Sequence, residues 1–330
     1  MKKLGLIVCC LLSFILAGAQ KDCAFVTATN LENIEYPFPV DYLHLTIQGE
    51  RLKMAYMDVQ PRKSNGKTVL LLHGKNFCSA YWEQTARDLV KEGYRVVIPD
   101  QIGFGKSSKP YHIQYSFQLL AANTKAILDY LHISQTIVVG HSMGGMLAAR
   151  FTLMFPERVS QLVLENPIGL EDWKTVVPYQ SVDDWYEAEL HQTYERMKQY
   201  QLAFYYNNEW KPEYDRWIDI QAGWTRNVNY PLIAWNSALL YDMIFTQPVC
   251  YEWKYIQAPT LLIIGQKDRT ALGKNKTPRS VQESLGNYPR LGRETAKQIR
   301  HCRLKEIDEA GHAPHLSDYR QFRKALLSFI

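Results

Sequence analysis

The sequence is poor in cysteine, and its six cysteines are not spaced as metal ligands. No C-x-x-C pair occurs, so a zinc site is not expected. Internal repeats and low-complexity tracts are also missing. The formal net charge of +5 is too small to indicate binding to nucleic acid or to an anionic membrane surface. With 330 residues, 46% of them hydrophobic, the chain can bury a large core, either as one domain with an insertion or as two domains.

A hydrophobic run long enough to span a bilayer is missing as well. Residues 4–16 are apolar and uncharged, but they fall short of the roughly 20 residues that a membrane span needs. Lys2 and Lys3 precede this run and a small-residue site, Ala-Gly-Ala at 17–19, follows it. These are the three parts of a secretory signal. We therefore predict a cleaved signal peptide at residues 1–19, a mature net charge of +3 once the two lysines are removed, and a secreted or periplasmic protein without a membrane span.

Four cysteines remain after removal of the signal: Cys23, Cys78, Cys250 and Cys302. In an oxidising compartment, four cysteines can pair in three ways. The spacing does not decide between disulfides and free thiols, so both alternatives stay open. A lipid anchor is not expected, because polar residues separate Cys23 from the small-residue site.

The remaining chain alternates between strand and helix patterns, which is typical of an α/β fold with a mainly parallel sheet. An opening hairpin is expected at residues 42–47 and 52–59. Six further strands are expected at residues 68–72, 95–99, 136–139, 161–164, 260–264 and 303–307. Most of these are continuous apolar runs, as strands buried on both faces should be. The sequence thus predicts eight strands flanked by helices, with a last helix that ends in residues 325–330.

Between residues 168 and about 250 the strand signals vanish and aromatic residues accumulate, including six of the eight tryptophans. Ser181 and Asp184 have the spacing of a helix cap, and an apolar stripe at helical spacing follows from Tyr186 to Phe204. Another helix is expected to begin at Pro231. We predict a helical lid at 168–250, inserted between the two parts of a core at 20–167 and 251–330.

The strongest catalytic signal is Gly140-His141-Ser142-Met143-Gly144, a G-x-S-x-G motif between an expected strand and an expected helix. The small residues allow a tight turn that exposes the serine hydroxyl above the sheet, next to a helix N-terminus. An incidental serine in a glycine-rich turn is the alternative, but the strand and helix on either side favour a nucleophile. Ser142 is therefore the predicted nucleophile.

A serine nucleophile needs a base, and the base needs an orienting acid. In folds of this type the chain order is serine, then acid, then histidine. Asp268 and His312 follow the expected strands at 260–264 and 303–307, so they are the predicted acid and base. Glu165 is the rival acid. His315 is the rival base, and we expect it instead to lie behind the catalytic residues or on the surface.

The tetrahedral oxyanion also needs hydrogen-bond donors. The backbone N–H of Met143, next after the nucleophile, is one candidate. His73 and Gly74 end the expected strand at 68–72, and the N–H of the following residue, Lys75, is the second candidate. Asp100, at the end of another strand, is expected to hold the following turn by accepting backbone hydrogen bonds.

Together these motifs resemble the α/β-hydrolase fold superfamily, specifically its lid-bearing branch of esterases and epoxide hydrolases. The resemblance covers about residues 67–166 and 259–330, whereas the lid matches only in position and helical character. It implies an α/β-hydrolase fold with Ser142 as nucleophile, Asp268 as acid and His312 as base. Epoxide hydrolases and haloalkane dehalogenases of this branch carry aspartate at the elbow, so the serine here favours acyl chemistry.

We therefore predict a serine hydrolase that cleaves an ester or amide of an apolar or aromatic small molecule without a metal or cofactor. Phe77, His141, Trp185 and Trp235 are the candidate substrate-binding residues, although packing within the lid will use most lid aromatics and the His141 side chain is expected to point away across the elbow. Two alternatives stay open: hydrolysis of a carbon–carbon bond in a diketone-like substrate, and a non-catalytic ligand-binding protein.

The stretch at 269–300, between the predicted acid and base, is longer than family members usually have. It is also basic, with lysines and arginines at positions 274, 276, 279, 290, 293, 297 and 300. Such a stretch could cover the site and attract anionic substrates. A solvated surface insertion is the favoured interpretation, because runs of charge mostly serve solvation.

Overall fold

A computed structural model describes residues 25–330. The predicted signal peptide and Cys23 lie outside this range. Within it, the model holds no helix with the length and apolar character of a membrane span. Cys78, Cys250 and Cys302 are free thiols, so no disulfide joins these three residues.

The centre of the fold is an eight-stranded sheet with the order β1-β2-β4-β3-β5-β6-β7-β8. Its strands are β1 (Asp41–Ile47), β2 (Glu50–Val59), β3 (Thr68–Leu72), β4 (Arg95–Pro99), β5 (Thr136–His141), β6 (Val159–Glu165), β7 (Thr260–Gly265) and β8 (Cys302–Ile307). β2 runs antiparallel to both of its neighbours, β1 and β4, and the other pairings are parallel. The mostly parallel eight-stranded sheet predicted from the sequence is confirmed.

Helices cover both faces of the sheet, which explains why β5 and β7 are buried along their whole length. The helices α2 (Phe117–Tyr130), α3 (Met143–Met154) and α9 (Tyr288–Gln298) share one hydrophobic cluster, and α1 (Glu83–Lys91) and α11 (Tyr319–Leu327) share the other. The short α10 (Pro314–Ser317) precedes α11. The last helix ends at Leu327, three residues before the predicted end.

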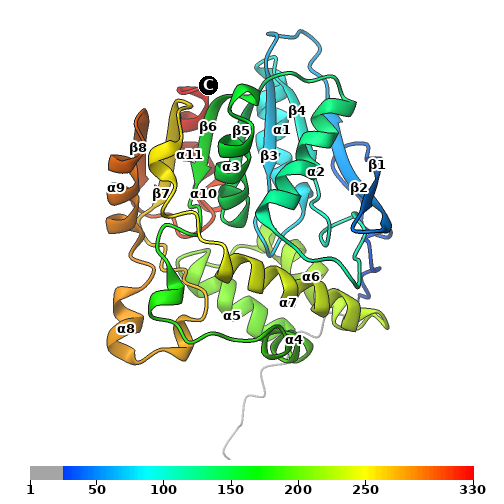
Figure 1. Ribbon diagram of the computed structural model, residues 1–330, viewed down its shortest axis with the longest axis vertical. Coiled ribbons are helices and arrows are strands. Elements are labelled where there is room, and N and C mark those ends of the chain that lie inside the picture. The colour runs from blue at the N-terminus through cyan, green and yellow to red at the C-terminus, as the bar shows by residue number, and fades with distance from the viewer. Residues whose placement is uncertain (1–24) are drawn as a thin grey trace, which may run out of the picture.

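Four helices follow β6 and precede β7: α4 (Val182–Leu190), α5 (Tyr194–Phe204), α6 (Asp215–Trp224) and α7 (Tyr230–Thr246). They lie together across one end of the sheet, below the strands in Figure 1. Ser181 and Asp184 form the expected capping box. The single stripe expected from Tyr186 to Phe204 is wrong, because the chain breaks there and Thr193 caps a new helix. We call these four helices the lid; its predicted limits at 168 and 250 stay a prediction.

Short 3₁₀ turns connect these elements. They lie at Ser79–Trp82, Pro156–Arg158, Trp173–Thr175, Pro212–Tyr214, Trp253–Tyr255 and Lys274–Lys276. The last of them belongs to the long stretch between β7 and β8, together with α8 (Arg279–Ser284) and α9. Arg279 pairs with Glu283, and Arg290 pairs with Glu294, both on the surface. These in-helix pairs suit a solvated insertion.

Candidate active site

Ser142 occupies a sharp turn between β5 and α3. Its backbone angles are φ 59° and ψ −120°, an unusual conformation for a residue with a side chain. The turn leaves no room for side chains at the glycines on either side of Ser142. A Cβ on Gly140 would lie 2.1 Å from the carbonyl oxygen of Gly144, and one on Gly144 would lie 2.2 Å from that of Leu72. Both positions therefore require glycine, and the turn has the geometry of a nucleophile elbow.

The structure brings Ser142, His312 and Asp268 together at the carboxyl ends of the parallel strands. Ser142 Oγ lies 2.8 Å from His312 Nε2, and His312 Nδ1 lies 2.6 Å from Asp268 Oδ2. Both His312 and Asp268 are fully buried. This is the spacing in which a histidine can take a proton from a serine while a carboxylate fixes its tautomer.

Asn166 holds Asp268 in place. Its side-chain Nδ2 donates to Asp268 Oδ2 at 2.7 Å, and its Oδ1 accepts from the N–H of Gly265 at 2.9 Å. The N–H of Thr270 donates to the other carboxylate oxygen at 2.8 Å. Sequence reasoning missed Asn166. The available signal was its position directly after β6, the strand that pairs with β7.

The rival residues pair with each other instead of with His312. Glu165 accepts the backbone N–H of His315 at 2.6 Å, and His315 Nδ1 lies 2.9 Å from the same carboxylate. Both residues are buried, and the His315 ring stacks on Trp82 with centroids 4.3 Å apart. His315 is therefore not a surface residue. Asp100 is fully buried and accepts backbone N–H groups from Ser79 and Lys106, as expected for a turn-holding carboxylate.

The two predicted oxyanion donors lie on either side of Ser142. In the described part of the chain, the backbone N–H groups of Lys75 and Met143 donate no hydrogen bond. A Cβ built on Gly74 would lie 3.2 Å from Ser142 Cβ, so the loop that carries Lys75 runs directly against the nucleophile. Buried backbone donors are usually paired, and two free ones beside a serine are available for a ligand oxygen.

A chain of buried hydrogen bonds joins this loop to the histidine. The carbonyl oxygen of His312 can only accept, so His141 Nε2, 2.8 Å away, carries the proton of the neutral ring. His141 Nδ1 therefore accepts from the Tyr81 hydroxyl at 3.0 Å, and that hydroxyl accepts the N–H of Gly74 at 2.8 Å. Burial, followed by the nearby His315 and His312, keeps the pKa of His141 well below its ordinary value, so the ring stays neutral.

The lid also touches the histidine. The carbonyl oxygen of Phe204, at the end of α5, accepts the backbone N–H of His312 at 3.1 Å. The neighbouring Tyr205 ring lies 4.9 Å from the imidazole, and its hydroxyl accepts from Asn76 Nδ2 at 2.8 Å. The lid is thus in direct contact with the loop that carries Lys75 and with His312, the predicted base.

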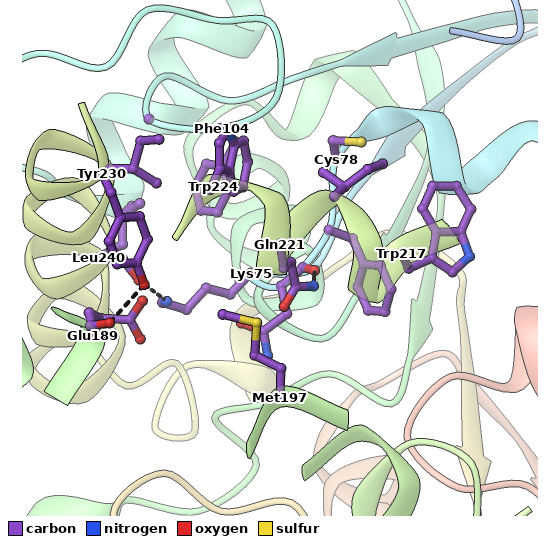
Figure 2. Close-up of a pocket in the computed structure, with 16 residues that line it drawn as sticks. Lys75, Cys78, Phe104, Glu189, Met197, Trp217, Gln221, Trp224, Tyr230 and Leu240 are labelled. Atoms are coloured by element: carbon purple, nitrogen blue, oxygen red, sulfur yellow. Dashed lines mark hydrogen bonds between the residues drawn. The ribbon is translucent and has the colours of Figure 1, made fainter. Parts of the chain in front are cut away.

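A cavity of about 90 Å³ lies between the lid and the loops after β3 and β4 (Figure 2). Aromatic side chains form much of its wall: Phe77, Phe104, Trp217, Trp224 and Tyr230. Its polar groups include Lys75, Glu189, Gln221 and Ser237. Ser142, Asp268 and His312 do not line the cavity, and Ser142 is only 5% exposed. The Lys75–Phe77 loop connects the cavity with the serine.

Of the four predicted substrate-binding residues, only Phe77 lines this cavity. His141 is buried in the hydrogen-bond chain behind the elbow. Trp185 stacks on Tyr241 with ring centroids 4.7 Å apart, and the indole N–H of Trp235 donates to the carbonyl of Tyr111. Sequence reasoning could not separate lid residues that face the cavity from those that pack the lid. Residues 25–330 contain no cluster of three or more side chains suited to hold a metal ion.

Comparison with known proteins agrees with the observed fold. A profile of the α/β hydrolase fold matches residues 67–204. The crystal structure of a probable hydrolytic enzyme from Pseudomonas aeruginosa PAO1 is 53% identical, with a TM-score of 0.92, over 93% of this chain and 99% of that one. An esterase from Exiguobacterium antarcticum shares the fold alone, at 22% identity and a TM-score of 0.64, over 87% and 98% of the two chains.

A Comamonas testosteroni protein named 2-hydroxy-6-oxononadienedioate/2-hydroxy-6-oxononatrienedioate hydrolase is 28% identical over 62% of this chain and 72% of its own length. A haloalkane dehalogenase from Mycolicibacterium paratuberculosis is 34% identical over 42% of this chain and 46% of its own. The chain belongs to the α/β hydrolase fold superfamily, and within it the chain is a hydrolase.

Proposed function

We propose that this protein is a serine hydrolase that cleaves an ester or amide bond of a small molecule through an acyl-enzyme intermediate. The observation that carries the proposal is the unbroken series of contacts from Ser142 Oγ to His312 and from His312 to Asp268. Two unpaired backbone N–H groups beside the serine support it.

In the proposed reaction, His312 Nε2 takes the proton of Ser142 as Oγ attacks the substrate carbonyl. The Lys75 and Met143 N–H groups bind the oxyanion, and each is worth roughly 3–4 kcal/mol of transition-state stabilisation. Asp268 keeps the proton of the neutral imidazole on Nδ1 and stabilises the imidazolium. His312 then protonates the leaving alcohol or amine, and a water molecule, activated by the same histidine, releases the acyl group from Ser142.

The proposal is tested with a fluorophosphonate probe, which labels an activated serine covalently. We expect labelling of the purified protein at a single peptide that contains Ser142, together with turnover of at least one 4-nitrophenyl ester. A folded protein that neither reacts with the probe nor hydrolyses an ester would point to the non-catalytic alternative.

Hydrolysis of a carbon–carbon bond is the second candidate, because the Comamonas relative is named as a hydrolase of a 2-hydroxy-6-oxo acid. Both reactions would use the same three side chains. Parallel assays with a 4-nitrophenyl ester and a ring-cleavage diketone separate them: our proposal requires the ester to have the larger kcat/KM.

We also propose that the protein is exported, on the basis of the signal pattern in residues 1–19. Expression of the full chain followed by fractionation and N-terminal sequencing tests this. We expect the exported form to begin at Gln20. An uncut chain that stays in the cytoplasm would contradict the proposal.

A further inference from the structure

Lys75 has two ends with different surroundings. Its backbone N–H belongs to the loop beside Ser142, while its side chain extends into the lid cavity (Figure 2). The ammonium Nζ donates to Ser237 Oγ at 2.7 Å and lies 3.3 Å from the centre of the Tyr241 ring. Lys75 is the only lysine or arginine among the residues that line the cavity. Its ammonium group therefore places a cation inside this cavity.

This cation lacks a close counter-ion. Within residues 25–330, no carboxylate forms an ion pair with Lys75. Lys75 is half-buried, and shielding an ammonium group from water is costly unless the group is paired and hydrogen-bonded. Burial lowers the pKa of Lys75 to about 8, although the charge of Glu189 acts in the opposite direction.

The ammonium group has three N–H donors, and Ser237 takes one of them. The Tyr241 ring offers its electron-rich face, which holds a cation but accepts no strong hydrogen bond. At least one donor therefore stays available to a ligand. A carboxylate would supply both the missing charge and a hydrogen-bond acceptor, and such charge-assisted bonds are about twice as strong as neutral ones.

We propose that the substrate is an anionic acyl ester, with a carboxylate that binds Lys75 and Ser237 and an apolar or aromatic stretch that lies along the cavity wall. This assignment rests on the proposed serine hydrolase function. The carboxylate end occupies the cavity, and the ester carbonyl reaches Ser142 past the backbone of Lys75. Glu189 lines the same cavity, so its charge opposes the anion, which gives the two side chains effects of opposite sign.

Three 4-nitrophenyl esters test the assignment: the hexanoate, the monoester of adipic acid, and that monoester capped as a methyl ester. They share one leaving group and a similar acyl chain, and only the adipate monoester carries a charge. The measured quantity is the kcat/KM of the charged substrate divided by that of each neutral one. Because it is a ratio, general damage to the catalytic groups cancels.

We expect the ratio, measured well below pH 8 so that Lys75 stays protonated, to exceed one in the wild type, to fall about tenfold or more in Lys75→Met, and to rise in Glu189→Gln. It should also fall as the pH rises through about 8, as Lys75 loses its proton. Lys75→Gln serves as the second variant if Lys75→Met does not fold. Equal ratios in wild type and both lysine variants, or equal preference for the capped diester, would overturn the proposal.

If the proposed serine hydrolase function itself is wrong, the same assays give a different result. In that case the wild type would hydrolyse none of the three esters and would not react with a fluorophosphonate. An enzyme that reacts with the probe and prefers the hexanoate would keep the hydrolase function while overturning the anionic substrate.

Discussion

The carboxyl edge of the sheet and the lid cavity are built from different interactions. At the edge, His312 and Asp268 are fully buried and held by short, directional hydrogen bonds from Asn166, Thr270 and the serine itself. In the cavity, aromatic faces dominate and the polar groups are few. Hydrogen bonds fix a reacting geometry, whereas apolar walls select by shape and size. If the proposed function holds, the core supplies the reacting groups, and the lid and the loops after β3 and β4 select the substrate.

Replacement of the nucleophile should produce the largest effect. In Ser142→Ala we expect kcat to fall by about 10⁴-fold or more, because the hydroxyl proposed to form the acyl bond is removed. Ester hydrolysis and fluorophosphonate labelling measure the loss, and Ser284→Ala, an exposed serine on α8, is the control. Fluorophosphonate labelling that persists in Ser142→Ala would show that another residue is the nucleophile.

Asp268→Asn should have the next largest effect. An asparagine keeps the shape of the side chain, but its amide can donate to His312 Nδ1 and so favour the wrong imidazole tautomer, as the corresponding change does in a serine protease, by about 10⁴-fold in kcat. The comparison with Glu165→Gln is informative because Glu165 pairs with His315 instead. A larger loss of kcat in Glu165→Gln than in Asp268→Asn would mean that Glu165, and not Asp268, is the acid.

Asn166→Leu tests how far the hydrogen bonds to Asp268 contribute. The change removes the donor to the carboxylate and the acceptor for Gly265, and it places leucine at the positive φ of 38° that Asn166 adopts, so the free energy of unfolding should decrease by at least about 1–3 kcal/mol. We expect kcat to fall while KM changes little, since Asn166 does not line the cavity. Denaturation with urea and steady-state kinetics provide the two values. A change confined to KM would show that the cavity and the edge are coupled here.

Tyr81→Phe removes the link between the oxyanion loop and His141. The N–H of Gly74 and Nδ1 of His141 would both lose their partner, at about 1–3 kcal/mol of stability. A fall in kcat smaller than that of Asn166→Leu is expected. His315→Gln is the matched comparison: it alters the same buried cluster, but its hydrogen bonds go to Glu165. Equal kinetic effects of the two changes would mean that general packing, and not the chain to His312, matters.

The smallest effect is expected in the insertion between β7 and β8. Lys276 and Arg279 are exposed, and exposed charges are worth about 0–1 kcal/mol each. The double variant Lys276→Glu with Arg279→Glu should therefore change kcat/KM by less than about twofold at physiological salt. A tenfold loss for an anionic ester that disappears at high salt would instead make the insertion an electrostatic guide for substrate.

Much of the fold could be predicted because each signal was local. A buried parallel strand is a short apolar run, and the small residues of the G-x-S-x-G motif indicate a tight turn. The helix break at His191–Thr193 escaped prediction because the apolar spacing continues across it and outweighed the one local signal, Thr193, whose side chain caps α5. Asn166 escaped because its partner Asp268 is 102 residues away.

The sequence by itself determined the eight strands, their order along the chain and the turn that carries Ser142. These features follow from the hydrophobic pattern and from steric requirements within a few residues. Tertiary structure alone decided that Asn166 supports Asp268, that His141 and Tyr81 join the loop to His312, and that the Lys75 side chain enters the cavity while Trp185 and Trp235 do not. Such contacts depend on which side chains meet across distant segments, and no local pattern records the direction in which a side chain will point.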